Sequence, residues 1–593
     1  MDKQEKKLVD ELRVKVHRTP DGKLIPLTDL KDLVCRAEST YGDRLAIVDK
    51  VKKGKEKVVV NHTVREFAEK RQALGEALTQ MGLKGKHVAI IGESSFQWIL
   101  SFFTIVCGVG VAVPIDKELR DEEISALCSK ADVEAVFCTR AYLGAAKLLL
   151  ERDERCKYCV CMNYAPADDR ILFFDDLLAR GKALVDDGAD GYRNAAVRPE
   201  DPCAIVFTSG TTGANKGVVL THKNLCANVD NVIEIIPTEY SSFSLLPMNH
   251  VFELSCNIMT AFYMNAVIYV NDSLKNILEN IQLFKPDAMN AVPLVLEGIY
   301  NGIWAAAAEQ GKDKALKKLV AFSNRLRSHG IDLRHVLFIS IRKKFGDKFP
   351  TLVCGGAPSR NAYVTGLGDF GFRVYNGYGL TETSPSVTLN MDAAADPTSA
   401  GYVVPRSEIK ISEPDADGVG EIWVRGDNVF SEYYKDPEAT AASFTDGWFK
   451  TGDYGRVTAE GELFVVGRKK TLIILDNGKN VFPEDVEFAV MDRTPYIKES
   501  CAFQSEKEIS GKRCSIIVIG VYVAREDFAG LSDDQITQKV RDDILNDVNK
   551  QIPAYKRVGD VMVSFSEFEK TSTRKIVRQK VIDAYEASAA RPQ

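Results

Sequence analysis

The sequence lacks an excess of charge of either sign. Its 593 residues carry 77 Lys and Arg against 83 Asp and Glu, a formal net charge of −6, which provides no overall positive field for a polyanion. Nucleic acid is therefore not expected as the main partner. With 45% hydrophobic residues, the chain can bury large cores, and its length predicts a globular protein of roughly three or four structural units.

An apolar run of signal-peptide length is also missing from the first 23 residues, which mix both signs of charge. Export is not indicated, so we expect a cytoplasmic protein. The thirteen cysteines are odd in number and scattered, which favours reduced thiols over a disulfide framework. Cys156, Cys159 and Cys161 are close together, but no His or second Cys pair lies nearby in sequence to complete a zinc site, so we expect a buried strand there.

One uncharged stretch, residues 98–115, has about the minimum length of a membrane-spanning helix. Gly108 and Gly110 interrupt it, and its end is rich in β-branched residues up to Pro114, which predicts a buried helix followed by a core strand. No transmembrane span is expected. A peripheral contact with a membrane stays open, although no amphipathic anchor stands out.

Strand-like apolar runs alternate with helical patterns over most of the chain, which predicts α/β layers with mostly parallel strands. From Ser407 onward, short strands with turn signals indicate a β-rich subdomain, with Glu460 and Gly461 as a hairpin turn. After Lys470 the pattern restarts with a helix, strands, a second helix, a strand and a last helix after Thr573. This order predicts a small, separate α+β domain of about a hundred residues.

The most informative motif is TSGTTGANKG at residues 208–217, between two strand-like runs. Small residues let backbone amides turn toward an anion, four hydroxyls add donors and Lys216 adds a positive charge, which together indicate a phosphate-binding loop. A flexible polar loop is the alternative. It is not a Walker A loop, because Asn215 stands where the second Gly belongs and Gly217 follows the lysine in place of Ser or Thr.

The glycines Gly366, Gly368 and Gly371 satisfy the GxGxxG pattern of dinucleotide-binding proteins, but in the wrong context. The pattern ends a predicted helix and leads into a strand, whereas the dinucleotide fingerprint follows a strand and opens a helix. We therefore interpret it as a turn.

Three further motifs carry groups suited to a nucleotide. In YNGYGLTETSP (residues 375–385), Tyr378 is suited to stacking on a base and Glu382 to binding magnesium, although a structural turn is an alternative. Asp453 and Arg468 are suited to ribose hydroxyls and phosphate, or to a surface ion pair. In the tail motif TSTRKIVR (residues 571–578), cations load the first turns of the last predicted helix, where the helix dipole disfavours them. A bound anion would offset this conflict; a solvated basic turn is the alternative.

In this order, TSGTTGANKG, GYGLTE, TGD, GRKK and TSTRKIVR resemble the AMP-forming adenylating superfamily of acyl-CoA synthetases, luciferases and peptide-synthetase adenylation domains, most closely its long-chain fatty acid branch. The resemblance covers the chain from about Leu30 to the end. It implies a large N-terminal domain (1–469) of two α/β-layered sheets plus a distorted β-barrel. A small, mobile α+β lid (470–593) would follow, with its hinge near Lys470.

The resemblance also implies the chemistry. A carboxylic acid would react with ATP to give an acyl adenylate and pyrophosphate, and coenzyme A would then displace AMP, with Mg²⁺ as cofactor. Lys575, Glu382 and His250 would be catalytic, although a packed core histidine is an alternative for His250, and Thr208 and Glu382 would bind the metal. Where many relatives have Gly before the lysine, this chain has Arg574. The nucleotide and thiol would contact Thr208, Ser209, Gly210, Thr211, Thr212, Lys216, Gly355, Gly356, Ala357, Asn376, Gly377, Tyr378, Gly379, Thr381, Asp453, Arg468, Lys470, Gly478, Lys479 and Asn480.

Several functions stay open at this point. Coenzyme A is favoured as acceptor because 18 residues follow Lys575, too few for a fused carrier domain, and because the hairpin before Lys470 lacks the insertion expected of ligases that load separate carrier proteins. Another acid, aryl or medium-chain, is an alternative to a long-chain fatty acid, since the apolar residues after His250 suit either a fatty chain or a core helix. A non-catalytic nucleotide-binding protein is disfavoured because both Glu382 and Lys575 are present.

Overall fold

The chain divides into two compact units, which are described separately. The first contains residues 1–409 and 424–449, and the second contains residues 410–423 and 450–593. The computed structural model describes residues 3–53, 56–166, 168, 170–208, 215–237, 239–346, 349–391, 396–476, 479–509, 512–570 and 576–589.

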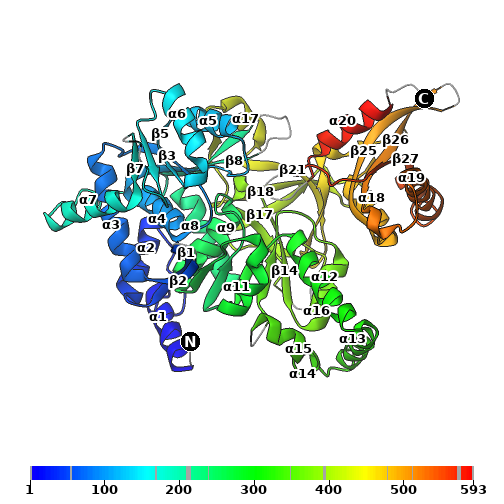
Figure 1. Ribbon diagram of the computed structural model, residues 1–593, viewed down its shortest axis with the longest axis horizontal. Coiled ribbons are helices and arrows are strands. Elements are labelled where there is room, and N and C mark those ends of the chain that lie inside the picture. The colour runs from blue at the N-terminus through cyan, green and yellow to red at the C-terminus, as the bar shows by residue number, and fades with distance from the viewer. Residues whose placement is uncertain are drawn as a thin grey trace. The chain divides into compact units, whose positions relative to one another are not determined.

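The first unit contains an eight-stranded sheet of mostly parallel strands (Figure 1). Both of its faces are covered, so its central strands are almost continuously apolar. In β3, Val88 and Ile90 face one core and Ala89 and Ile91 face another. The strands in order are β19 (Glu432–Tyr433), β9 (Lys216–Thr221), β8 (Pro202–Thr208), β4 (Gly110–Pro114), β3 (Lys86–Ile91), β5 (Val133–Cys138), β6 (Tyr158–Cys161) and β7 (Ile171–Phe173).

A nine-stranded sheet forms the second sheet of this unit. Its middle strands β1, β11, β10, β12, β13 and β14 pair in parallel, and antiparallel strands complete both edges. The α/β class predicted from the alternating pattern is confirmed. The strands in order are β16 (Tyr402–Val403), β15 (Ser386–Leu389), β14 (Arg373–Gly379), β13 (Thr351–Cys354), β12 (Ala288–Ala291), β10 (Ser241–Ser244), β11 (Val267–Val270), β1 (Leu45–Lys53) and β2 (Glu56–Thr63).

Helices fill the space between the two sheets and cover their outer faces. The inner layer shares one apolar core with both sheets and comprises α2 (Leu30–Tyr41), α3 (Val64–Gln80), α4 (Phe96–Thr104), α8 (His222–Ile235) and α10 (Thr260–Met264). The eight-stranded sheet is covered outside by α5 (Asp121–Lys130) and α6 (Leu143–Arg152). The nine-stranded sheet is covered outside by α11 (Ile277–Phe284), α12 (Pro293–Glu309), α13 (Asp313–Arg327) and α16 (Asn361–Phe370). The remaining helices are α1 (Lys3–His17), α7 (Phe174–Asp186), α9 (Val251–Glu253), α14 (Arg334–Leu337), α15 (Ile339–Arg342) and α17 (Pro437–Ser443).

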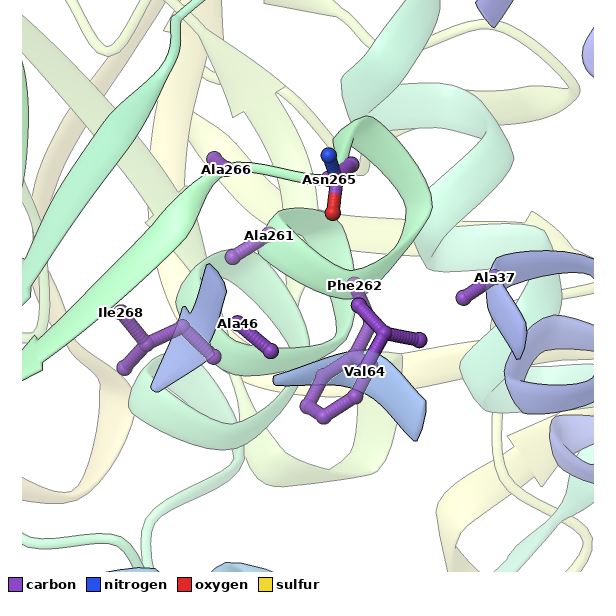
Figure 2. Close-up of a pocket in the computed structure, with 8 residues that line it drawn as sticks. All are labelled: Ala37, Ala46, Val64, Ala261, Phe262, Asn265, Ala266 and Ile268. Carbon is purple, nitrogen blue, oxygen red and sulfur yellow. The ribbon is translucent and has the colours of Figure 1, made fainter. Parts of the chain in front are cut away.

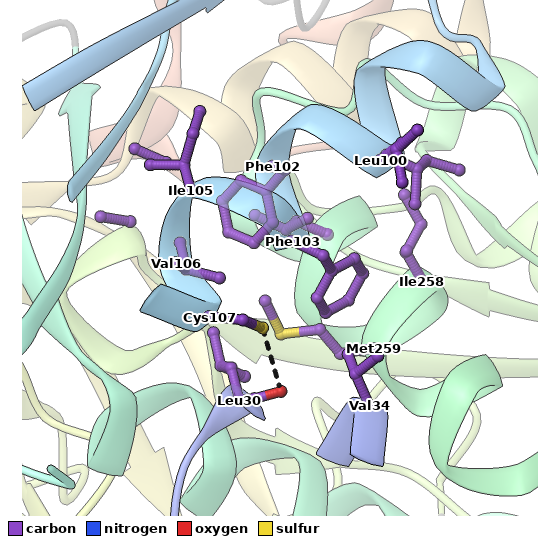
Figure 3. Close-up of a cluster of buried hydrophobic side chains, with 14 of the residues drawn as sticks. Leu30, Val34, Leu100, Phe102, Phe103, Ile105, Val106, Cys107, Ile258 and Met259 are labelled. Atoms are coloured by element: carbon purple, nitrogen blue, oxygen red, sulfur yellow. Dashed lines mark hydrogen bonds between the residues drawn. The ribbon is translucent and has the colours of Figure 1, made fainter. Parts of the chain in front are cut away.

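The uncharged stretch 98–115 is a buried helix and strand, as predicted. Ser95 caps α4 by accepting from the Trp98 N–H, the helix ends in a π-helical turn (Ile105–Val109), and Gly108 there has φ 155° before β4 begins. In the central core, Phe103 lies beside Met259, and the Cys107 thiol donates to the Leu30 carbonyl (Figure 3). Within the described residues, no helix combines the length and apolarity needed to cross a membrane.

The β-rich segment predicted after Ser407 forms a five-stranded sheet in the order β17 (Ser407–Ser412), β18 (Gly420–Gly426), β21 (Trp448–Val457) and β20 (Phe444–Thr445), with β22 (Leu463–Arg468) also paired to β21. The predicted turn between β21 and β22 is present, and Gly461 has φ 94° there. The GxGxxG pattern is likewise a turn: Gly371 (φ 106°) ends α16 just before β14. Both predictions are confirmed.

The second unit has a three-stranded sheet of β25 (Ile497–Ile509), β26 (Lys512–Val523) and β27 (Val558–Ser564), and a two-stranded sheet of β23 (Ile473–Ile474) and β24 (Asn480–Val481). Alternate residues of β26 face opposite cores. Ile517 and Ile519 pack under α18 (Pro483–Arg493) and α19 (Asp533–Asp542), and Ile516 and Val518 pack under α20 (Arg578–Ala589). The predicted α+β character of this region is confirmed.

Candidate active site

The carboxyl ends of parallel strands β10, β12, β13 and β14 bring the predicted binding segments to one edge of the nine-stranded sheet. His250 follows β10, Gly355, Gly356 and Ala357 follow β13, and Glu382 follows β14. The strands are held in register by ladder bonds, and the Gly355 N–H extends them by donating to the Ala291 carbonyl at 3.1 Å.

Two glycines of this edge have no room or conformation for a side chain. A Cβ on Gly379 would lie 1.8 Å from the Pro385 carbonyl oxygen, and Gly356 has φ 84°, a conformation that favours glycine. Gly379 is therefore required by the close packing of its own backbone against Pro385, and Gly356 by its backbone conformation. The amide of Asn376 is used within the protein, accepting from the Ser359 hydroxyl at 2.9 Å and donating to a backbone carbonyl at 2.7 Å.

Glu382 lies in a single 3₁₀ turn (Thr381–Thr383) that follows β14. Its backbone and its side chain each accept a hydrogen bond. Its carbonyl accepts from the Phe430 N–H at 2.8 Å, and its Oε1 accepts from the Tyr433 hydroxyl at 2.8 Å. Burial and the Glu382 charge raise the pKa of Tyr433, so the phenol stays protonated and keeps donating. No described residue donates to Oε2, so this oxygen is available to a cation.

Tyr433 also contacts Lys216. The Lys216 Nζ lies 4.4 Å from the centre of the Tyr433 ring, a distance at which a cation is attracted to an aromatic face. The contact follows from the sheet, because β19 pairs with β9 and places Tyr433 opposite Val218, two residues from Lys216. One tyrosine therefore positions both a carboxylate and an ammonium group.

The ends of the phosphate-loop motif are held by the β8–β9 hairpin, in which Thr208 lies directly opposite Lys216. The hairpin thus holds the two ends of the predicted loop next to each other. Ser209, Gly210, Thr211 and Thr212, which were predicted to bind phosphate, lie outside the described residues.

His250 lies directly before α9, at the start of a segment whose apolar side chains are buried. Val251, Leu254 and Ile258 are all buried in the central core, so the apolar residues after His250 form a core helix. Glu253 in the same turn is fully buried, and burial raises the pKa of its carboxyl to about 8. Its Oε1 accepts from the Asn257 amide at 2.7 Å, and burial favours the neutral form of the carboxyl.

In the second unit, Asp453 and Arg468 lie opposite each other on β21 and β22. The Arg468 Nε is 3.1 Å from the Asp453 Oδ1; the carboxylate is buried, and the guanidinium is about half exposed. Lys470 lies in the turn after β22, Lys479 places its Nζ 4.9 Å from the Tyr555 ring, and Asn480 begins β24. The ion pair leaves the guanidinium edge accessible to a ligand.

The tail motif is only partly described, because residues 571–575, Lys575 among them, lie outside the described residues. Gly478, which was predicted to contact the thiol, also lies outside them. Arg578 begins α20, and its charge is balanced by protein carboxylates, Glu487 at 2.6 Å and Glu484 at 3.5 Å. Arg578 is therefore neutralised within the protein, whereas Arg574 and Lys575 lie outside the described residues, so a bound anion and a solvated basic turn both stay predictions for the rest of the motif. The pairing joins positions 91 residues apart, which sequence spacing does not reveal.

The structure bears on metal binding in two places. No described group of three or more His, Cys, Asp or Glu side chains is placed to hold a metal ion, and Cys159 and Cys161 lie in the buried strand β6, as predicted. A single carboxylate such as Glu382 nevertheless suits Mg²⁺, which usually takes one or two carboxylates together with water and substrate phosphates. The residues present therefore fit a magnesium ion brought in with a nucleotide.

One small pocket elsewhere in the first unit carries no catalytic group. It lies among α2, β1, α10 and β11 and is mostly apolar, with Asn265 as its polar side chain (Figure 2). None of the predicted site residues lines it, so we assign it no part in the chemistry. Its lining residues are Ala37, Ala46, Val64, Ala261, Phe262, Asn265, Ala266 and Ile268.

A hairpin that closes the predicted phosphate loop, and a carboxylate held by a hydrogen bond after a parallel strand, are features expected of a nucleotide-binding enzyme. Comparison with family models gives the particular family: the AMP-binding enzyme model matches residues 35–434, and the AMP-binding enzyme C-terminal domain model matches residues 470–590. The chain belongs to the AMP-binding, adenylate-forming enzymes.

Curated relatives and solved structures agree with this assignment. The chain is 31% identical to the long-chain-fatty-acid–CoA ligase FadD15 of Mycobacterium bovis over 72% of each protein. It is 27% identical to the human long-chain-fatty-acid–CoA ligase 1 over 73% of this chain and 66% of that protein. The fold matches the anthranilate CoA ligase AuaEII bound to anthranoyl-AMP with a TM-score of 0.73, at 21% identity, over 96% of this chain and 99% of that one.

Proposed function

We propose that this enzyme activates a long-chain fatty acid with ATP and transfers the acyl group to coenzyme A. The observation that carries the proposal is the Tyr433 bridge, in which one side chain hydrogen-bonds Glu382 and lies under Lys216. It sets a carboxylate for a cation beside an ammonium group for phosphate, the pair that binding a triphosphate requires. Relatives named as long-chain-fatty-acid–CoA ligases support the choice of acid.

In the first step, a carboxylate oxygen of the acid bonds to the α-phosphorus of ATP, and the bond to the bridging oxygen breaks, releasing pyrophosphate. Thr208, Lys216 and the loop between them bind the β- and γ-phosphates, and Glu382 holds Mg²⁺, which offsets phosphate charge when bound. Lys575 reaches the reacting carboxylate and α-phosphate. An anion attacks an anion here, so positioned positive charge lowers the barrier.

In the second step, the sulfur of coenzyme A, as thiolate, bonds to the acyl carbon, and the bond to the AMP oxygen breaks, releasing AMP. Asp453 and Arg468 hold the ribose. We propose that residues 470–593 act as a lid that turns about Lys470 and brings Gly478, Lys479 and Asn480 to the thiol. Gly355, Gly356, Ala357 and Tyr378 flank the adenine, with His250 beside the acyl group.

A cytoplasmic location completes the proposal. All thirteen cysteines are described, and each is a free thiol, which suits a reducing compartment.

The test is isotope exchange between pyrophosphate and ATP, measured with magnesium across acetate, medium- and long-chain fatty acids, aryl acids and amino acids. We expect exchange with long-chain fatty acids. Lys575→Ala should nearly abolish it, by about 10²–10³-fold or more, while still transferring the acyl group from supplied acyl adenylate to coenzyme A.

The matched control is Lys580→Ala, an exposed residue of α20 with the same loss of charge, which should exchange at the wild-type rate. Equal loss of both half-reactions in Lys575→Ala would refute the role assigned to that lysine. Exchange supported by amino acids in place of fatty acids would refute the substrate class.

A further inference from the structure

The helical segment at residues 312–345, on the outer side of the nine-stranded sheet, is strongly basic. It contains ten Lys and Arg against two Asp, a net charge of +8 within a chain whose net charge is −6. Such a concentration of one sign creates a local positive potential that the whole chain does not have. The segment comprises α13, α14, α15 and the turn at Lys343–Phe345.

Helix α13 has one packed face and one exposed face. Leu316, Leu319 and Val320 pack against the outer core of the nine-stranded sheet. On the opposite face, Lys314, Lys318 and Arg325 align at spacings of four and seven residues, with Phe322 beside them at 52% exposure. The exposed face is thus a row of cations flanking a large aromatic side chain.

The cations of this face differ from neighbouring cations that are neutralised. Arg327, on the inner side of α13, lies 3.4 Å from Asp369, and Arg334 lies 2.6 Å from Asp332. Among the described residues, no acidic side chain lies within ion-pairing distance of Lys314, Lys318 or Arg325. Their charge is available to an external partner.

Exposed aliphatic side chains continue the surface onto the next two helices. Ile331, Leu333, Val336 and Ile339 are all exposed, and Val336 has 56% of its surface accessible. Figure 1 shows α13, α14 and α15 following one another along one edge of the first unit, and contacts join each helix to the next. A concentration of large apolar side chains on a surface marks a site of interaction.

We propose that this α13–α15 surface docks on a membrane that contains anionic lipids. The lysine and arginine side chains pair with anionic headgroups, and Phe322 and the aliphatic side chains enter the boundary with the acyl chains. A nucleic acid or other purely ionic partner would use the cations but leave the exposed apolar side chains in water. The inference goes beyond the proposed reaction: the surface holds the enzyme where water-insoluble acids are concentrated.

The experiment is co-sedimentation of the full-length protein with vesicles of phosphatidylcholine alone or of phosphatidylcholine containing phosphatidylglycerol. We expect sedimentation with the anionic vesicles only, and release at high salt. The triple variant Lys314→Gln, Lys318→Gln, Arg325→Gln should weaken the partition coefficient by roughly a hundredfold. Phe322→Ser should weaken it by about tenfold, with pyrophosphate exchange and thermal unfolding unchanged.

Two matched controls remove the same groups elsewhere. Lys84→Gln, Lys157→Gln, Arg193→Gln removes three exposed cations, and Leu531→Ser removes an exposed apolar side chain; both should bind like wild type. The proposal fails if wild type ignores anionic vesicles or if the controls lose as much binding. It fails as well if heparin binds and competes while Phe322→Ser has no effect on sedimentation, because charge alone would then explain the surface.

Discussion

Replacing Tyr433 by phenylalanine tests how the site is assembled. The change removes the hydroxyl that donates to Glu382 at 2.8 Å and keeps the ring under Lys216. A hydrogen bond to a charged group contributes about 1.5–3 kcal/mol. Because its loss releases the Glu382 carboxylate from its metal-binding position, the rate of exchange should fall by about ten- to a hundredfold. Pyrophosphate exchange measured over a magnesium titration should show a lower maximum and a higher magnesium requirement.

The neighbouring tyrosine provides the control. Tyr434 also donates to a carboxylate, Asp132 at 2.6 Å, so Tyr434→Phe makes the same chemical change one residue away. It should leave exchange and the magnesium requirement as in wild type. Wild-type exchange by Tyr433→Phe, or an equal loss in Tyr434→Phe, would refute the positioning role.

Three further outcomes follow from the same contacts. Lys216→Ala should raise the KM for ATP and lower exchange by about 10²–10³-fold, whereas Lys223→Ala, which breaks only an ion pair with Asp427, should not. Gly379→Ala should lower the free energy of unfolding by at least about 1–3 kcal/mol in urea denaturation. Gly368→Ala, at a position with open space around it, should not. Equal stability of the two variants would contradict the tight packing at Gly379. The raised pKa of Glu253, about 8, contributes stability below pH 4.5 that is lost as the pH rises toward 8. Wild type should therefore lose stability relative to Glu253→Gln by up to about 1.4 kcal/mol per pH unit in that window, and parallel pH curves would show the carboxyl is not held neutral.

Periodicity was sufficient to predict the layers. Gly108 and Gly110 interrupt the stretch at 98–115, and the helical part ends and the strand begins at these glycines. The loop at 208–217 is flanked by apolar runs, and these are β8 and β9. Elements of this kind depend on local alternation and turn residues, which a single sequence contains.

The contacts that organise the site could not be predicted in this way. Tyr433 lies on a two-residue edge strand, 51 residues from Glu382, and only the pairing of β19 with β9 brings it to Lys216. Glu253 follows an apolar pair in NHVFE, and nothing in that spacing shows that its carboxyl is enclosed by core residues on every side. Arg578 looked like an uncompensated charge because its carboxylate partners come from a distant helix, α18. Tertiary pairing, rather than local pattern, decides each of these cases.

The most direct test of the proposed reaction is the product balance of the complete reaction. Purified enzyme is incubated with ATP, magnesium, palmitate and coenzyme A, and all nucleotide and acyl products are quantified by mass spectrometry. The proposed function requires palmitoyl-CoA, AMP and pyrophosphate in equal amounts, with palmitoyl adenylate accumulating when coenzyme A is left out. Release of ADP and phosphate in place of AMP and pyrophosphate, or no acyl adenylate under any condition, would contradict it.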